Sequence, residues 1–143
     1  MDCPYCAHND TKVLESRLVS EGVRRRRSCG KCENRFTTYE KAFFNLTVLK
    51  KDGRMQPFDT KKISESLQRS CIKVDDTKLI EITNLIERKL LAKKINPIKT
   101  KEIGKVVLRE LKKIDKMAYL RFASIHKSIE DPKLLEKELQ TIT

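Results

Sequence analysis

Four cysteines near the start of the chain have the spacing of a metal site. They form two Cys-x-x-Cys pairs, Cys3 with Cys6 and Cys29 with Cys32, and 22 residues separate the pairs. Each pair places two thiolates at a tight turn, and one tetrahedral zinc ion can join the two turns. Four cysteine ligands leave no coordination position open, so we expect one structural Zn²⁺ per chain. The separation has room for a strand, a turn and a second strand, which predicts a zinc ribbon.

Two other uses of paired cysteines fit this sequence less well. Disulfides would require an oxidising compartment, but no charged segment followed by an apolar segment comes after Met1. A redox centre of the thioredoxin kind uses one Cys-x-x-Cys at the start of a helix in a βαβ unit, and neither pair has that context. The fifth cysteine, Cys71, lies in a helical apolar pattern and is predicted to be a core residue. We therefore expect a cytoplasmic protein with reduced cysteines.

The predicted ribbon carries a run of four consecutive arginines at residues 24–27. Residues 11–19 favour a strand, Ser20-Glu21-Gly22 favours a turn, and residues 23–28 favour the returning strand that contains the run. Successive side chains on a strand point to opposite faces, so the four arginines divide into two pairs, one on each face.

The arginine run has two interpretations. It can simply keep an exposed hairpin solvated, as many charged runs do. It can also neutralise phosphates and reach base edges, because further arginines and hydroxyl groups lie close to it in the sequence. We favour the second interpretation, in which the ribbon binds DNA or RNA. The predicted contact residues are Arg17, Arg24, Arg25, Arg26, Arg27, Arg35, Thr37 and Tyr39.

The overall charge agrees with a polyanionic partner. The chain has 32 Lys and Arg against 20 Asp and Glu, which gives a net charge of +12. Arginines concentrate in the first part and lysines in the second. No apolar run reaches the roughly 18 residues of a membrane span, so we expect no membrane partner.

From Leu46 onward the pattern changes to a short β-hairpin and then to helices. Asp52-Gly53 is a strong hairpin turn, and Asp59 can cap the first helix. Further helices are predicted from Asp75, from Thr100 as a cap, over residues 118–129 and in a C-terminal tail. The sequence thus predicts an α+β protein with an all-β ribbon at residues 1–45 and a mainly helical domain at residues 46–143.

Two motifs resemble known domains. The hairpin Val48-Leu49-Lys50-Lys51-Asp52-Gly53-Arg54, followed by Pro57-Phe58-Asp59 and Lys62-Ile63, resembles the ATP-cone, a nucleotide-binding regulatory domain. A ribbon with the arginine run, Cys29-x-x-Cys32 and Arg35-Phe36-Thr37-Thr38-Tyr39-Glu40 precedes it. Together, and with the stretch at residues 118–124, they resemble the NrdR family of bacterial repressors of ribonucleotide reductase genes.

The resemblance implies a nucleotide-dependent transcriptional repressor rather than an enzyme. ATP and dATP would bind the ATP-cone and change the homo-oligomeric state, and dATP would allow paired ribbons to bind double-stranded operator DNA. The implied nucleotide-binding residues are Val48, Lys50, Lys51, Arg54, Phe58, Lys62, Ile63 and Tyr119. His126 and Ile129 stand where the family usually has tyrosine and phenylalanine. The alternative is a constitutive nucleic-acid-binding protein whose helical domain only dimerises. An ATP-using enzyme is disfavoured, because the chain has no GxxxxGK[ST] motif.

Overall fold

The computed structural model describes residues 1–20 and 22–143. The chain divides into two compact units, Met1–Phe44 and Asn45–Thr143. The α+β fold class predicted from the sequence is confirmed, with an all-β unit first and a mainly helical unit second.

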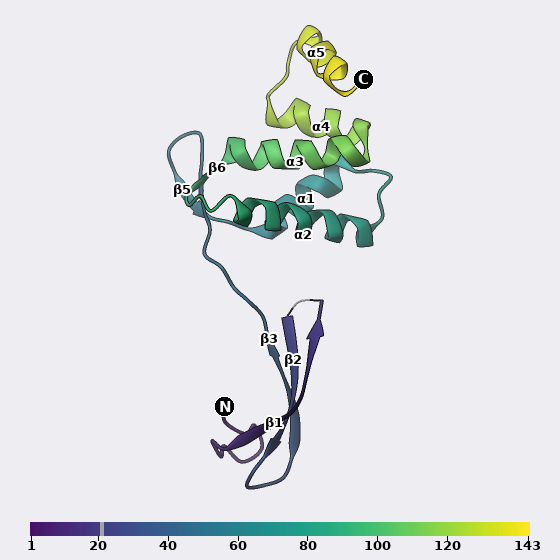
Figure 1. The fold of residues 1–143 in the computed structure, drawn as a ribbon. Helices are drawn as coiled ribbons and strands as arrows, with labels where there is room; N and C mark the ends of the chain where they lie inside the picture. Colours follow the sequence, from purple (N-terminus) through teal and green to yellow (C-terminus); the bar gives the residue numbers. More distant parts are fainter. Residues whose placement is uncertain (21) are drawn as a thin grey trace. The chain divides into compact units, whose positions relative to one another are not determined.

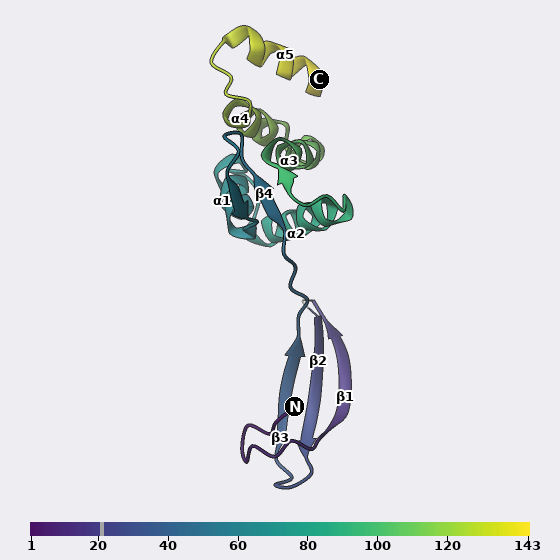
Figure 2. The same ribbon diagram turned by 90° about the vertical axis from the view of Figure 1, so that its left-hand side faces the viewer.

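The first unit is an antiparallel sheet in the order β1-β2-β3 (Figure 2). Its strands are β1 (Thr11–Val19), β2 (Gly22–Cys29) and β3 (Arg35–Glu40). The first two strands agree with the prediction, whereas the third was not expected to be a strand. The predicted turn at Ser20-Glu21-Gly22 includes Glu21, which lies outside the described residues.

The first unit contains little apolar core. Cys3 and Cys29 are its buried hydrophobic residues within the described part, while Leu18 is 89% exposed. A sheet of this size cannot bury enough apolar surface to be stable alone, so a bound metal would supply much of its folding free energy.

The second unit begins with a small three-stranded sheet in the order β5-β4-β6. The strands β4 (Thr47–Leu49) and β5 (Met55–Pro57) form the predicted hairpin. Its turn is closed by the Gly53 N–H, which donates to the Lys50 carbonyl at 3.1 Å. The third strand, β6 (Ile98–Lys99), pairs in parallel with β4 and was not predicted.

The rest of this unit is mainly helical (Figure 1). Its helices are α1 (Thr60–Ser70), α2 (Asp76–Ala92), α3 (Thr100–Ile114), α4 (Lys116–His126) and α5 (Pro132–Ile142). Asp59 caps α1, as predicted, and α2 begins near Asp75, also as predicted; Asp75 proves to be its cap, and each carboxylate accepts a backbone N–H of the first turn. The packed helices bury Leu67, Ile86 and Leu111 completely.

Two helix ends differ from the prediction. Thr100 does not cap α3: it is the first helical residue, and its hydroxyl donates to the Leu49 carbonyl at 3.2 Å. The fourth helix ends at His126 rather than continuing through Ile129. Ser128 has a φ of 50°, and the Ile129 N–H turns back to the Ser124 carbonyl at 2.9 Å. The left-handed residue and this hydrogen bond are the marks of a Schellman motif, which ends a helix by satisfying its last carbonyls.

None of the helices formed by the described residues combines the length and the apolar composition that crossing a membrane requires.

Candidate zinc centre, nucleic-acid interface and nucleotide pocket

The four predicted zinc ligands converge on one point. All four Sγ atoms lie within 4.8 Å of one another. The Sγ atoms of Cys3 and Cys32 are 3.6 Å apart, as are those of Cys6 and Cys29. Four sulfurs at about 2.3 Å from a tetrahedral zinc ion would be separated by about 3.8 Å. The thiol cluster therefore has the dimensions of a four-cysteine zinc site.

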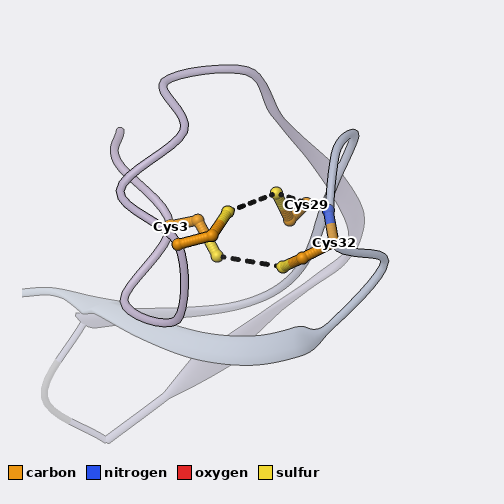
Figure 3. Close-up of side chains that lie close together, drawn as sticks. Cys3, Cys29 and Cys32 are labelled. Atoms are coloured by element: carbon orange, nitrogen blue, oxygen red, sulfur yellow. Dashed lines mark hydrogen bonds between the residues drawn. The ribbon is translucent and has the colours of Figure 1, made fainter.

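The turns that carry the cysteines also hold the sulfur atoms in place. Cys3 lies across from Cys29 and Cys32 (Figure 3). The backbone N–H of Lys31 points at the Cys29 Sγ at 3.3 Å, and the Asn34 side-chain amide points at the Cys32 Sγ at 3.4 Å. Hydrogen bonds from the Asn34 backbone lower the pKa of Cys32 to about 6. Donors of this kind stabilise thiolates, the form that binds zinc.

The strand register divides the arginine run between the two faces of the sheet. Arg24 is paired with Arg17 on β1 and with Tyr39 on β3. Because side chains alternate along each strand, six of the eight predicted contact residues share this face. These residues form the Arg24 face: Arg17, Arg24, Arg26, Arg35, Thr37 and Tyr39.

The Arg24 face presents mostly unpaired cations. Within the described part of the chain, the side chains of Arg24, Arg26 and Arg35 have no hydrogen-bond or ion-pair partner. Arg17 is the exception, because it pairs with Glu15 two residues earlier on the same strand. Unpaired guanidinium groups on one surface can bind phosphates without first breaking an internal ion pair.

Arg25 and Arg27 lie on the opposite face, and both have partners within the sheet. Nε of Arg25 donates to Oε1 of Glu40 at 2.7 Å. Nε of Arg27 donates to Oγ1 of Thr38 at 3.1 Å. The structure therefore separates these two arginines from the other six predicted contact residues.

The second unit contains a pocket of about 400 Å³ between the small sheet and helices α1, α3 and α4. This volume is in the usual range of small-molecule sites, about 300–1,000 Å³. Its wall is largely apolar, and three cationic side chains line it: Lys50, Lys62 and Arg69. A pocket with an apolar wall and several cations suits a ligand with a flat ring system and phosphate groups.

The pocket brings together five of the eight predicted nucleotide-binding residues. They are Val48, Lys50, Phe58, Lys62 and Ile63. The other three, Lys51, Arg54 and Tyr119, do not line it.

Arg54 and Tyr119 have other partners in the structure. Arg54 donates to Asp52 at 2.6 Å within the hairpin turn. Tyr119 is buried, and its hydroxyl donates to Glu138 of α5 at 2.9 Å. Lys51 lies in the same hairpin turn as Asp52.

Several residues that line the pocket were not predicted from the sequence. Arg69 is seven positions after Lys62 on α1, and Ser66 lies between them at helical spacing, so this cationic helix face was visible in the sequence. Phe122 and His126 come from α4, far away in the chain, and no local pattern pointed to them.

Gly104 and His126 together shape one side of the pocket. A Cβ atom added to Gly104 would lie 1.9 Å from Nε2 of His126, so the absence of a side chain makes room for the imidazole. Phe122 stacks on the same ring with centroids 5.6 Å apart. Burial lowers the pKa of His126, and the positive charges of Lys51 and Lys127 lower it further.

Comparisons with known proteins match both units. Residues 1–40 match the model of the N-terminal domain of NrdR-like transcriptional repressors, and residues 46–132 match the ATP cone domain. A protein of Finegoldia magna named transcriptional repressor NrdR is 42% identical over an alignment of 147 positions, which covers 99% of this chain and 98% of that protein. Proteins of the same name from Acidovorax sp. and Bacillus cereus are 44% and 42% identical, over 92% and 99% of this chain and 91% and 96% of their own length.

These relatives are named as transcriptional repressors, which are regulators and not enzymes. Two family models and full-length similarity to proteins of one name leave a single assignment. With its four-cysteine ribbon and its ATP-cone, the chain belongs to the NrdR family of transcriptional repressors.

Proposed function

We propose that this protein represses ribonucleotide reductase genes by binding operator DNA through its ribbon, under the control of ATP and dATP in the ATP-cone. One Zn²⁺ per chain, held by the four cysteines, would keep the sheet folded. The observation that carries the proposal is that one chain combines the Arg24 face, where three arginines have no side-chain partner among the described residues, with a pocket lined by cationic side chains.

The Arg24 face is suited to double-stranded DNA. Guanidinium groups can contact phosphates along the backbone, and one or two can reach guanine edges in the major groove. Thr37 and Tyr39 are exposed beside them and add hydroxyl donors. A homo-oligomer would place two such faces on one operator, as repressor dimers do on paired half-sites.

The pocket is suited to an adenine nucleotide. Lys50, Lys62 and Arg69 would meet the phosphates, while Val48, Phe58 and Ile63 would contact the base or ribose. Lys62 lies in the first turn of α1, where the helix dipole is unfavourable for a cation, and a bound phosphate would relieve this conflict.

Control by two nucleotides requires differential binding. A ligand that bound every oligomeric state equally would shift no equilibrium. ATP and dATP differ by one ribose hydroxyl, so that hydroxyl must favour one assembly over another. We propose that the dATP-bound assembly is the one that binds DNA.

The test is to measure the affinity of the zinc-loaded protein for a reductase promoter fragment, with ATP and with dATP, in the wild type and in two variants. The wild type should bind the promoter more tightly with dATP. The control Lys61→Gln should behave in the same way, because Lys61 is exposed and does not line the pocket. Lys62→Gln should respond only at about tenfold higher dATP, since a charge-assisted hydrogen bond is lost. Equal affinity for the promoter with either nucleotide in the wild type would instead favour a constitutive nucleic-acid-binding protein.

A further inference from the structure

His126 occupies a confined position at the last residue of α4. Gly104 of α3 leaves space for its imidazole, and Phe122 holds one face of the ring by stacking. The side chain is also part of the pocket lining. The imidazole is therefore held at the wall of a pocket that three cationic side chains line.

The charged groups around this imidazole are mainly positive. Lys51 of the β4–β5 turn and Lys127 directly after α4 both act on His126. Lys50 of the hairpin, with Lys62 and Arg69 of α1, line the same pocket. Asp59 lines it as well, but its carboxylate accepts the Lys61 N–H at the start of α1.

The protein groups around His126 by themselves favour the neutral imidazole. Burial is the largest reason that the pKa of His126 is lowered, and the two neighbouring lysines add to it. A polyphosphate in the pocket would change the balance, because its negative charges would offset the lysines and attract a proton.

We propose that His126 is a proton-linked ligand contact, whose imidazole takes up a proton when a nucleoside polyphosphate binds in the pocket. The inference rests on the proposed function, since it needs the pocket to bind such a ligand. Its consequence is that protons and nucleotide favour each other's binding. The contribution of His126 to nucleotide affinity therefore rises as the pH falls towards and below neutrality.

The direction of the pH effect on nucleotide affinity follows from the linkage between proton binding and nucleotide binding. If the pKa of His126 is higher with ligand than without, the complex holds more protons than the free protein between those two values. Lower pH then favours the complex in that interval. One linked proton can change the affinity by up to about tenfold per pH unit.

The chain is convenient for testing this inference, because it has two histidines, His8 in the ribbon and His126 in the pocket. The imidazole signals of the zinc-loaded full chain can be followed by NMR over a pH series, with and without saturating ATP. The variants His8→Gln and His126→Gln assign the two signals, and the first is the matched control.

The expected result is an upward shift of the His126 pKa when ATP is bound, and the signal of His8 in the ribbon serves as the reference. Calorimetric ATP affinities at pH 7.5 and 6.0 should then show a gain of threefold or more in the wild type and in His8→Gln, relative to His126→Gln. This comparison removes the titration of the ATP phosphates themselves, which all three proteins share. ATP binding with an unchanged His126 pKa would overturn this inference alone, whereas the absence of ATP binding would overturn the proposed function as well.

Discussion

The guanidinium group of Arg25 donates from Nε to the Glu40 carboxylate at 2.7 Å, on the face of the ribbon opposite to Arg24. This ion pair bridges β2 and β3, so it contributes to the sheet itself. It shows that four identical neighbouring residues have two different environments. The difference can be tested in DNA binding.

Substitution of Arg26 should weaken DNA binding more than substitution of Arg27. Arg26 is exposed and unpaired within the described part of the chain, whereas Arg27 donates to Thr38 on the other face. Loss of one phosphate contact should reduce the salt dependence of log K by about one unit of slope. Fluorescence anisotropy of labelled promoter DNA at several salt concentrations measures both quantities. Equal losses for Arg26→Gln and Arg27→Gln would show that the faces do not differ in DNA contact.

Removal of zinc should unfold the ribbon without unfolding the helical unit. The ribbon has little buried apolar surface, whereas the second unit has its own core. Chelation, or the substitution Cys32→Ser, should therefore abolish DNA binding and leave the helical circular dichroism signal and ATP binding nearly unchanged. Calorimetry should show the loss of one thermal transition. A coincident loss of ATP binding would contradict the independence of the two units.

The C-terminal helix should depend on Glu138. This carboxylate accepts hydrogen bonds from the buried Tyr119 hydroxyl and from Lys127 at 2.5 Å. Glu138→Ala should lower the free energy of unfolding of the second unit by about 1–3 kcal/mol, because it leaves the Tyr119 hydroxyl without an acceptor. Glu136→Ala on the same helix is the control and should cost much less. Urea denaturation followed by circular dichroism gives both values.

The same carboxylate should make the stability depend on pH. The Lys127 hydrogen bond, and after it the Tyr119 hydrogen bond, lower the pKa of Glu138 in the folded protein. Its stabilising effect is therefore complete above the ordinary glutamate pKa and is lost as the pH falls through the lower folded value. The difference in unfolding free energy between wild type and Glu138→Ala should shrink in acid. A difference that stays constant down to strongly acidic pH would contradict this explanation.

A methyl group at position 104 should be destabilising because of His126. Gly104→Ala forces the imidazole out of its place, which should cost about 1–3 kcal/mol of unfolding free energy. In a His126→Ala background the same change should cost little, since the obstructing ring is gone. A double-mutant cycle by urea denaturation measures the difference. An equal cost in both backgrounds would mean that the clash is not with the imidazole.

Local patterns predicted the parts of the fold that depend on nearby residues. The cysteine spacing indicated the zinc site, and Asp59 and Asp75 marked the starts of α1 and α2 because side-chain capping is local. The Asp52-Gly53 turn was recognisable for the same reason. What these patterns share is that a few consecutive residues decide the backbone.

Features that depend on distant partners were not predictable in this way. The strand β6 has two residues and is defined by pairing with β4, about fifty residues away in the chain. Thr100 resembles a cap, but the Leu49 carbonyl accepts its hydroxyl instead. The pocket residue His126 is placed by Gly104 on another helix, and this contact exists only in the folded unit.

The most direct test of nucleotide control is the mass of the zinc-loaded protein in solution, measured by light scattering with ATP alone and again after dATP is added. The affinity for a reductase promoter fragment is measured on the same samples. If the two nucleotides control this repressor as proposed, dATP changes the mass and produces a salt-sensitive DNA complex that is absent or weak with ATP alone. The same mass and the same DNA affinity with both nucleotides would contradict this control.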